Sequence, residues 1–176
     1  MNPAVGPFTI AAVLLVLGGA LKVLRPHDTA VALQAAGVPT GDHVVRLGAA
    51  AEVALGATAL VAFGAVPAAF VAASYLVFLA FVTLALTRRL PIASCGCFGK
   101  ADTPPSLVHA AVNGVAVVCA LAMALDPSTS PLDALTDGLP GSAAFGLLVA
   151  VGVLAAFLTL TLLPRTLAVA VRGTQP

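Results

Sequence analysis

Apolar residues along the chain fall into five long continuous stretches that short polar segments separate. The stretches run over residues 7–24, 44–63, 67–87, 106–125 and 142–163. Each is long enough to cross about 30 Å of hydrocarbon as a helix, and continuous rather than alternating apolar residues favour helices over a β-barrel. The pattern therefore predicts an all-α integral membrane protein in which residues 1–176 form a single membrane domain. The expected architecture is an antiparallel helical bundle of about five transmembrane helices.

The polar segments between these stretches indicate how the helices are connected. We expect a short interfacial helix after the first span, with Asp28 as its N-cap and Gly37 as its terminator. Residues 64–66 are predicted to form a tight turn, which would make the second and third spans antiparallel neighbours. The longer connections over residues 88–105 and 126–141 are expected to be polar loops.

The composition agrees with a chain that lies in a lipid bilayer. Hydrophobic residues make up 60% of the chain and charged residues only 9%, whereas soluble domains carry about 25% charged residues. A net charge of +1 without a basic stripe gives no reason to expect a nucleic-acid partner. Residues 1–8 contain no Lys or Arg, so we expect the first apolar stretch to be an uncleaved helix rather than a signal peptide.

The basic residues predict an orientation in the cell membrane. With five spans, all eight Lys and Arg residues fall on one side of the membrane. These residues are Lys22, Arg25, Arg46, Arg88, Arg89, Lys100, Arg165 and Arg172. The positive-inside rule then places the N-terminus outside the cell and the C-terminus in the cytoplasm of a multi-pass protein. The loop over residues 88–105 would face the cytoplasm.

Four polar side chains of the spans are predicted to lie toward one membrane face: Lys22, Glu52, His109 and Asn113. Ser106, His109 and Asn113 fall on one side of a helix, because successive residues advance by about 100°. Glu52 lies about 12 Å inside its helix, where a carboxylate needs a partner such as Lys22. Two readings stay open for Glu52. It is either a structural ion pair or neutral hydrogen-bonding clamp, or a group that transfers protons or lines a ligand site.

Cys95 and Cys97 are the candidates for reactive groups. One Gly separates their thiols, and a disulfide over that spacing is strained and easily exchanged. The same two thiolates are also suited to a soft metal such as copper or zinc, with His109 as a third ligand. A third reading gives the two cysteines no role. Cys119, farther along the fourth span, is expected to be a small packing residue.

The segment Ser94-Cys95-Gly96-Cys97-Phe98-Gly99 resembles the MauE family, the methylamine-utilisation membrane proteins related to the DoxX group. The resemblance covers roughly residues 7–125, which would form a MauE/DoxX-like core of four helices. Further similarities lie at Lys22, Glu52, Gly56, Ser106 and Asn113.

The resemblance implies a redox-associated membrane protein that supports thiol–disulfide exchange or protein disulfide maturation with a thioredoxin-like partner. Cys95 and Cys97 would then be the catalytic, exchanging thiols, and Glu52 and Asn113 supporting polar residues. The family is linked to maturation of a disulfide-rich periplasmic enzyme, on the side opposite to a cytoplasmic thiol loop. The alternatives are a soft-metal binding or transport protein and a non-catalytic membrane scaffold. No cofactor is required by these residues, and both a quinone and a soft metal stay open.

Overall fold

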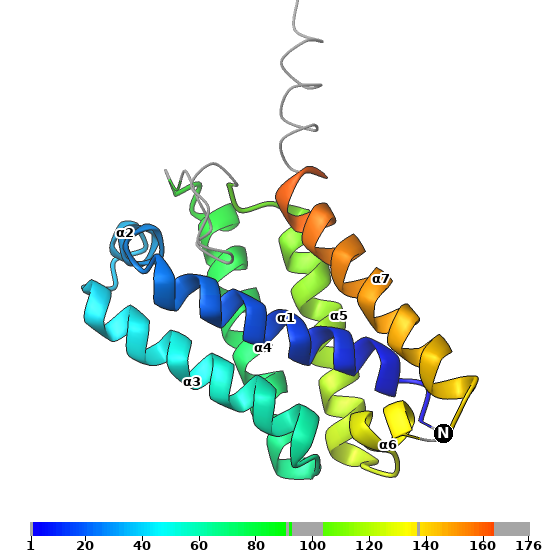
Figure 1. Cartoon of the computed structure of the whole chain (residues 1–176). Coiled ribbons are helices and arrows are strands. Elements are labelled where there is room, and N and C mark those ends of the chain that lie inside the picture. The colour runs from blue at the N-terminus through cyan, green and yellow to red at the C-terminus, as the bar shows by residue number, and fades with distance from the viewer. Residues whose placement is uncertain (1, 91, 93–103, 137, 164–176) are drawn as a thin grey trace, which may run out of the picture.

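The computed structural model describes residues 2–90, 92, 104–136 and 138–163, and this part of the chain is helical. Its helices are, in chain order, α1 (Val5–Leu24), α2 (His27–Ala35), α3 (Asp42–Val61), α4 (Ala65–Thr87), α5 (Leu107–Leu125), α6 (Pro131–Thr136) and α7 (Gly141–Thr161). Five of these described helices, α1, α3, α4, α5 and α7, are long and apolar enough to cross a membrane (Figure 1). The predicted all-α bundle of about five transmembrane helices is therefore confirmed.

Helix α1 crosses the bundle and packs against α3, α5 and α7, whereas α4 packs along α5 (Figure 1). Two glycines allow the close contact between α1 and α3. A Cβ atom on Gly19 would lie 2.8 Å from the carbonyl oxygen of Ala49, and one on Gly56 would lie 2.8 Å from that of Ala12. Small residues that let helix backbones approach are typical of interfaces between helices in membranes.

The core lies between α1, α4 and α5. Phe8, Leu15, Val71 and Met123 are among its fully buried side chains. The hydroxyl of Tyr75 donates a hydrogen bond of 2.7 Å to the backbone carbonyl of Ala11, which links α4 to α1 within this core. A buried tyrosine hydroxyl usually has such a hydrogen-bond partner.

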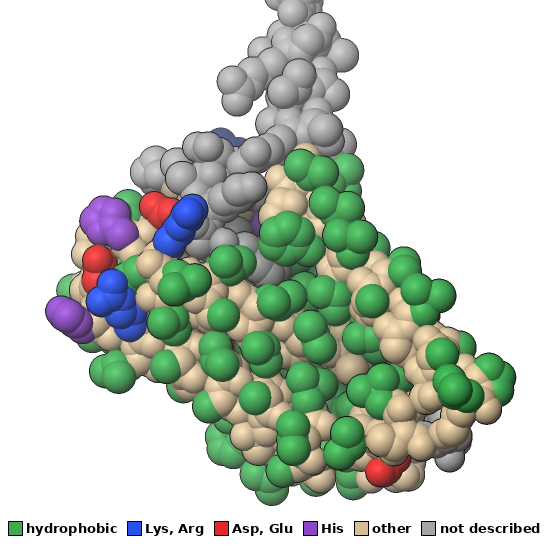
Figure 2. All heavy atoms as spheres, viewed as in Figure 1, with side chains coloured by type: hydrophobic (Ala, Val, Ile, Leu, Met, Phe, Trp, Pro, Cys, Tyr) green, Lys and Arg blue, Asp and Glu red, His purple; other side chains and the backbone are tan. Residues whose placement is uncertain are grey.

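The outer surface of the long helices is apolar. Figure 2 shows hydrophobic side chains over most of the visible face, with most of the visible charged and His side chains at the end where α2 lies and an acidic one at the opposite end. At this end, His27 Nδ1 lies 3.5 Å from Asp42 Oδ1 in an exposed pair. Large apolar side chains such as Val118 on α5 and Leu154 on α7 are exposed. Lipid is the solvent that suits such a surface.

The connection after α1 is partly as predicted. A short helix is present there, and it ends as expected, because Gly37 has a φ of +86° and the Val38 N–H donates to the Leu33 carbonyl. The prediction that Asp28 is the N-cap is wrong. Pro26 holds the N-cap position, and its carbonyl accepts the N–H of Ala30. Asp28 instead lies in the first turn, where a negative charge favours the helix dipole.

Two other connections differ from the prediction. The segment over residues 126–141 is not all loop, since it contains α6. Pro131 is the first residue of α6, and Ser130 Oγ accepts the backbone N–H of Asp133 at 2.9 Å. The helix is too short to show a hydrophobic period. The turn between α3 and α4 lies at residues 62–64 rather than 64–66, and these two helices are in contact as expected.

Candidate functional site

A buried ion pair connects α1 and α3. Lys22 Nζ lies 2.6 Å from Glu52 Oε2 and 2.8 Å from Glu52 Oε1, so the ammonium donates to both carboxylate oxygens. The side chains are only 7% and 17% exposed, respectively. The ammonium also lies 4.4 Å from the centre of the Phe78 ring on α4, a cation–π contact that adds to the pair. Two full charges at this depth therefore compensate each other.

The position of Glu52 follows from the small residues around it. A Cβ atom on Gly19 would come within 3.1 Å of Glu52 Cβ, so the glycine leaves the space in which the glutamate stem lies. Lys22 follows Gly19 by one helical turn on the same face of α1, and its long stem brings the ammonium to the carboxylate. Arg46, the other basic residue near Glu52 in the sequence, is exposed.

The beginning of α5 supplies two further buried polar side chains. His109 is 1% exposed, and its Nδ1 lies 2.8 Å from Ser106 Oγ. Asn113, one turn farther along α5, is 8% exposed. Ser106 is the N-cap residue, yet its hydroxyl bonds to the imidazole rather than capping a backbone N–H. The helical face predicted for Ser106, His109 and Asn113 is thus present in the structure.

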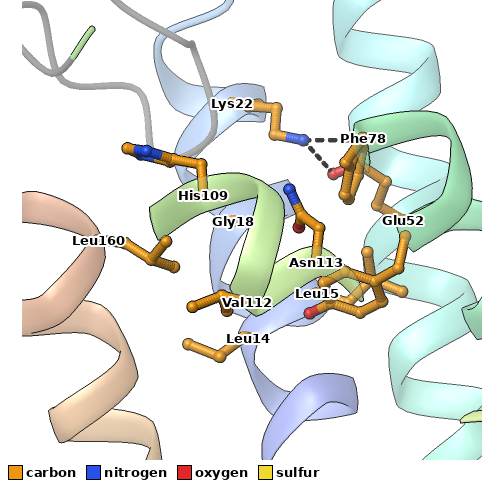
Figure 3. A pocket seen from close by; sticks show the side chains of 11 residues that line it. Leu14, Leu15, Gly18, Lys22, Glu52, Phe78, His109, Val112, Asn113 and Leu160 are labelled. Atoms are coloured by element: carbon orange, nitrogen blue, oxygen red, sulfur yellow. Dashed lines mark hydrogen bonds and ion pairs between the residues drawn. The ribbon is translucent and has the colours of Figure 1, made fainter. Parts of the chain in front are cut away.

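These side chains meet at a small cavity of about 40 Å³ between α1, α3, α4, α5 and α7 (Figure 3). In Figure 3 the amide of Asn113 extends toward the Lys22–Glu52 pair, whereas the His109 ring is directed away from it. The lining consists of Leu14, Leu15, Gly18, Lys22, Glu52, Tyr75, Phe78, His109, Val112, Asn113 and Leu160. Such a volume is larger than the roughly 10–15 Å³ that a single water needs.

Asn113 stands out among the polar residues of this cavity. Within the described part of the chain, no hydrogen-bond partner is found for its side-chain amide. A buried amide without a partner is costly, since its two N–H donors and its oxygen lose water without replacement. The amide is therefore available to a molecule that enters the cavity.

The two candidate cysteines, Cys95 and Cys97, lie outside the described residues. The described ends of their segment are Ile92, which packs against Ala32 of α2 and Ala85 of α4, and Pro104, just before the start of α5. Cys119 is half-buried on α5 and does not line the polar cavity. No group of three or more His, Cys, Asp or Glu side chains suited to a metal occurs among the residues that were placed.

The sequence of the chain matches the model of a known protein family. The family model described as methylamine utilisation protein MauE matches residues 3–126, which is more than half of the chain. The chain belongs to the MauE family. The MauE match includes α1 to α5, and with them the ion pair, His109, Asn113 and the segment that holds the two cysteines. Neither the curated proteins nor the solved structures give a match to this MauE-family chain.

Sequence reasoning alone missed Phe78, and it left open whether Tyr75 hydrogen-bonds into the bundle, as it does, or only packs. Phe78 lies beneath the Lys22 ammonium, and Tyr75, one turn earlier on α4, packs edge-on against the Phe78 ring. Their spacing of three residues puts both on one face of α4, which is the only signal that the sequence offers. Aromatic residues are common in apolar helices, so this spacing does not by itself distinguish a site from a core.

Proposed function

We propose that this MauE-family protein supports thiol–disulfide exchange in the membrane, with Cys95 and Cys97 as the exchanging thiols and a thioredoxin-like protein as the partner. The single observation that carries the proposal is a buried polar site at the membrane face to which the cysteine segment is attached. Cys95 is the third residue after Ile92, and a chain of three residues reaches at most about 11 Å. Ile92 itself packs against α2 and α4 at the end of the bundle where Lys22 lies.

The exchange needs no additional reactant beyond the partner. The Cys95 thiolate attacks a disulfide of the partner, which forms a mixed disulfide and frees one partner thiolate. Cys97 then attacks the mixed disulfide, closes the Cys95–Cys97 bond and frees the second partner thiolate. Two electrons pass from the cysteine pair to the partner, and the two protons of the cysteine thiols end on the partner thiols. The reverse sequence oxidises the partner.

The buried polar residues support this exchange rather than carry it out. Lys22 and Glu52 form an ion pair without net charge, and this pair joins α1 to α3. His109 and Asn113 occupy the first two turns of α5, the helix that follows the cysteine segment. We propose that these four residues hold the start of α5, which follows the cysteine segment, in place against α1 and α3.

The proposed location is the cell membrane, with the N-terminus outside and the C-terminus in the cytoplasm. The charge distribution supports this orientation, since all eight basic residues then fall on the cytoplasmic side. A cytoplasmic thiol pair exchanges with a cytoplasmic partner. A periplasmic client would need either the opposite orientation or passage of reducing equivalents through the bundle.

Alkylation of the cysteines in intact cells tests both the redox proposal and the orientation. In a Cys119→Ala background, a membrane-impermeant maleimide added outside should leave Cys95 and Cys97 unlabelled, whereas a permeant maleimide should label both. Mild oxidation should abolish both labels together, and a reductant should restore both. Labels that survive oxidation at both positions would contradict the exchange proposal, and labelling from outside would reverse the orientation.

A further inference from the structure

A second, larger cavity adjoins the polar one. It is an apolar groove of about 310 Å³ between α1, α5 and α7, at the low end of the volumes found for ligand pockets. Ala111 and Val115 of its α5 wall are exposed, so the groove opens on the surface that faces lipid. Tyr75 contributes a hydroxyl to the lining, but that hydroxyl is already bonded to Ala11. The groove is therefore suited to hydrocarbon.

The groove and the polar cavity are neighbours. Leu14, Tyr75 and Val112 line both of them, so the same side chains separate hydrocarbon on one side from the ion pair on the other. Together the two spaces have the form of a site for a molecule with an apolar chain and a polar end.

We propose that this site binds an uncharged membrane amphiphile, with one apolar chain in the groove and a terminal carbonyl or hydroxyl group at Asn113. Asn113 is buried and lines the cavity, and its amide, which has two N–H donors and an acceptor oxygen, has no partner among the described residues. The inference is independent of the cysteines and goes beyond the exchange reaction.

Charge and size define the class of head group. The Lys22–Glu52 pair is neutral as a whole, so it provides no net positive charge for a phosphate, and the Glu52 carboxylate would repel one. The polar cavity of about 40 Å³ has room for a few atoms of a carbonyl or hydroxyl group and not for a phosphocholine group. The head group that fits both the charge and the size of the polar cavity is therefore small, polar and uncharged.

Photolabelling of the purified full-length protein in detergent tests the proposal. The probe is a long-chain primary alcohol that carries a diazirine in its chain. We expect its crosslinks to map to the groove segments of α5 and α7, and unlabelled alcohol to compete while the matched alkane and the matched alkyl phosphocholine do not. Equal competition by the phosphocholine or the alkane would overturn the assignment of the head group.

Two adjacent alanines of α7 offer a matched pair of variants. Ala156 lines the groove, whereas Ala155 is exposed and does not line it. Ala156→Phe should reduce labelling about tenfold, and Ala155→Phe should leave it within about twofold of the unmodified protein, a difference that corresponds to about 1.4 kcal/mol per factor of ten. Equal labelling of the two variants would mean that the probe binds anywhere on the apolar outer surface rather than in the groove, and this result would overturn the proposal.

Asn113→Leu provides an independent test of the polar end. The variant keeps an apolar side chain of similar size and removes the amide. Labelling by the alcohol probe should then fall about five- to tenfold, because one hydrogen bond to a buried group is lost, and the matched alkane should compete in neither protein. An unchanged affinity for the alcohol would contradict a head group at Asn113.

Discussion

Lys22 and Glu52 are thirty residues apart in the sequence, and their charges lie within 3 Å of each other inside the bundle. Neither charge would be stable at this depth alone, because an isolated ion in a low-dielectric interior is costly. The pair is therefore a unit whose energy depends on both members. Asn113 lines the same cavity, and among the described residues no side chain bonds to its amide.

The ion pair can be tested by a double-mutant cycle. Glu52→Met and Lys22→Met should each lower the free energy of unfolding by about 3 kcal/mol, because each leaves one buried charge without its partner. The double variant Lys22→Met/Glu52→Met should recover most of that loss, since two apolar side chains replace both ions. Denaturant unfolding in detergent measures all three. A double variant whose loss equals the sum of the single losses would contradict a mutually compensating pair.

The same variants separate stability from function. If the pair only holds α1 and α3 together, the double variant should exchange disulfides as well as the unmodified protein. We expect instead that the double variant is nearly as stable as the unmodified protein but exchanges disulfides more slowly than that protein, since the polar cavity has lost its charges.

Helix α1 is the element that organises the bundle. It packs against α3, α5 and α7 and accepts a hydrogen bond from Tyr75 of α4. Its contact with α3 is close because both helices have glycine where they meet. The four polar residues come from α1, α3 and α5, so the arrangement of these helices decides whether the polar cavity exists.

Two glycines of α3 give a matched test of this packing. A Cβ atom on Gly56 would lie 2.7 Å from Val16 Cγ2 and 2.8 Å from the Ala12 carbonyl, whereas one on Gly48 meets nothing within 4 Å. Gly56→Ala should destabilise the protein by about 1–3 kcal/mol through overpacking. Gly48→Ala should be neutral or stabilising by up to about 1 kcal/mol, because alanine favours helix. Thermal unfolding in detergent compares them, and equal effects would contradict a close α1–α3 contact at Gly56.

For the whole molecule, the sequence predicts the architecture better than it predicts the site. Long apolar stretches leave few folds open, so the five spans and the short helix near residue 30 were predictable, and the polar face of α5 followed from helical spacing. The short helix α6 was not predictable, since six residues are too few to show a helical period of apolar positions. The aromatic contact of Phe78 with Lys22 and the apolar groove depend on how separate helices pack, which no spacing along one helix contains.

The buried polar side chains that α1 and α5 contribute to the polar cavity lie toward the end of the bundle where Ile92 and Pro104, the described neighbours of the cysteine segment, are found. The proposed function depends on the chemistry of Cys95 and Cys97. Trapping in cells is the most direct measurement. In a Cys119→Ala background, Cys97→Ser leaves Cys95 without its resolving partner, so a mixed disulfide with a second protein should accumulate. A reductant should release that adduct, and Cys95→Ser/Cys97→Ser should not form it. A stably produced Cys97→Ser protein that forms no mixed disulfide with any protein would contradict thiol–disulfide exchange.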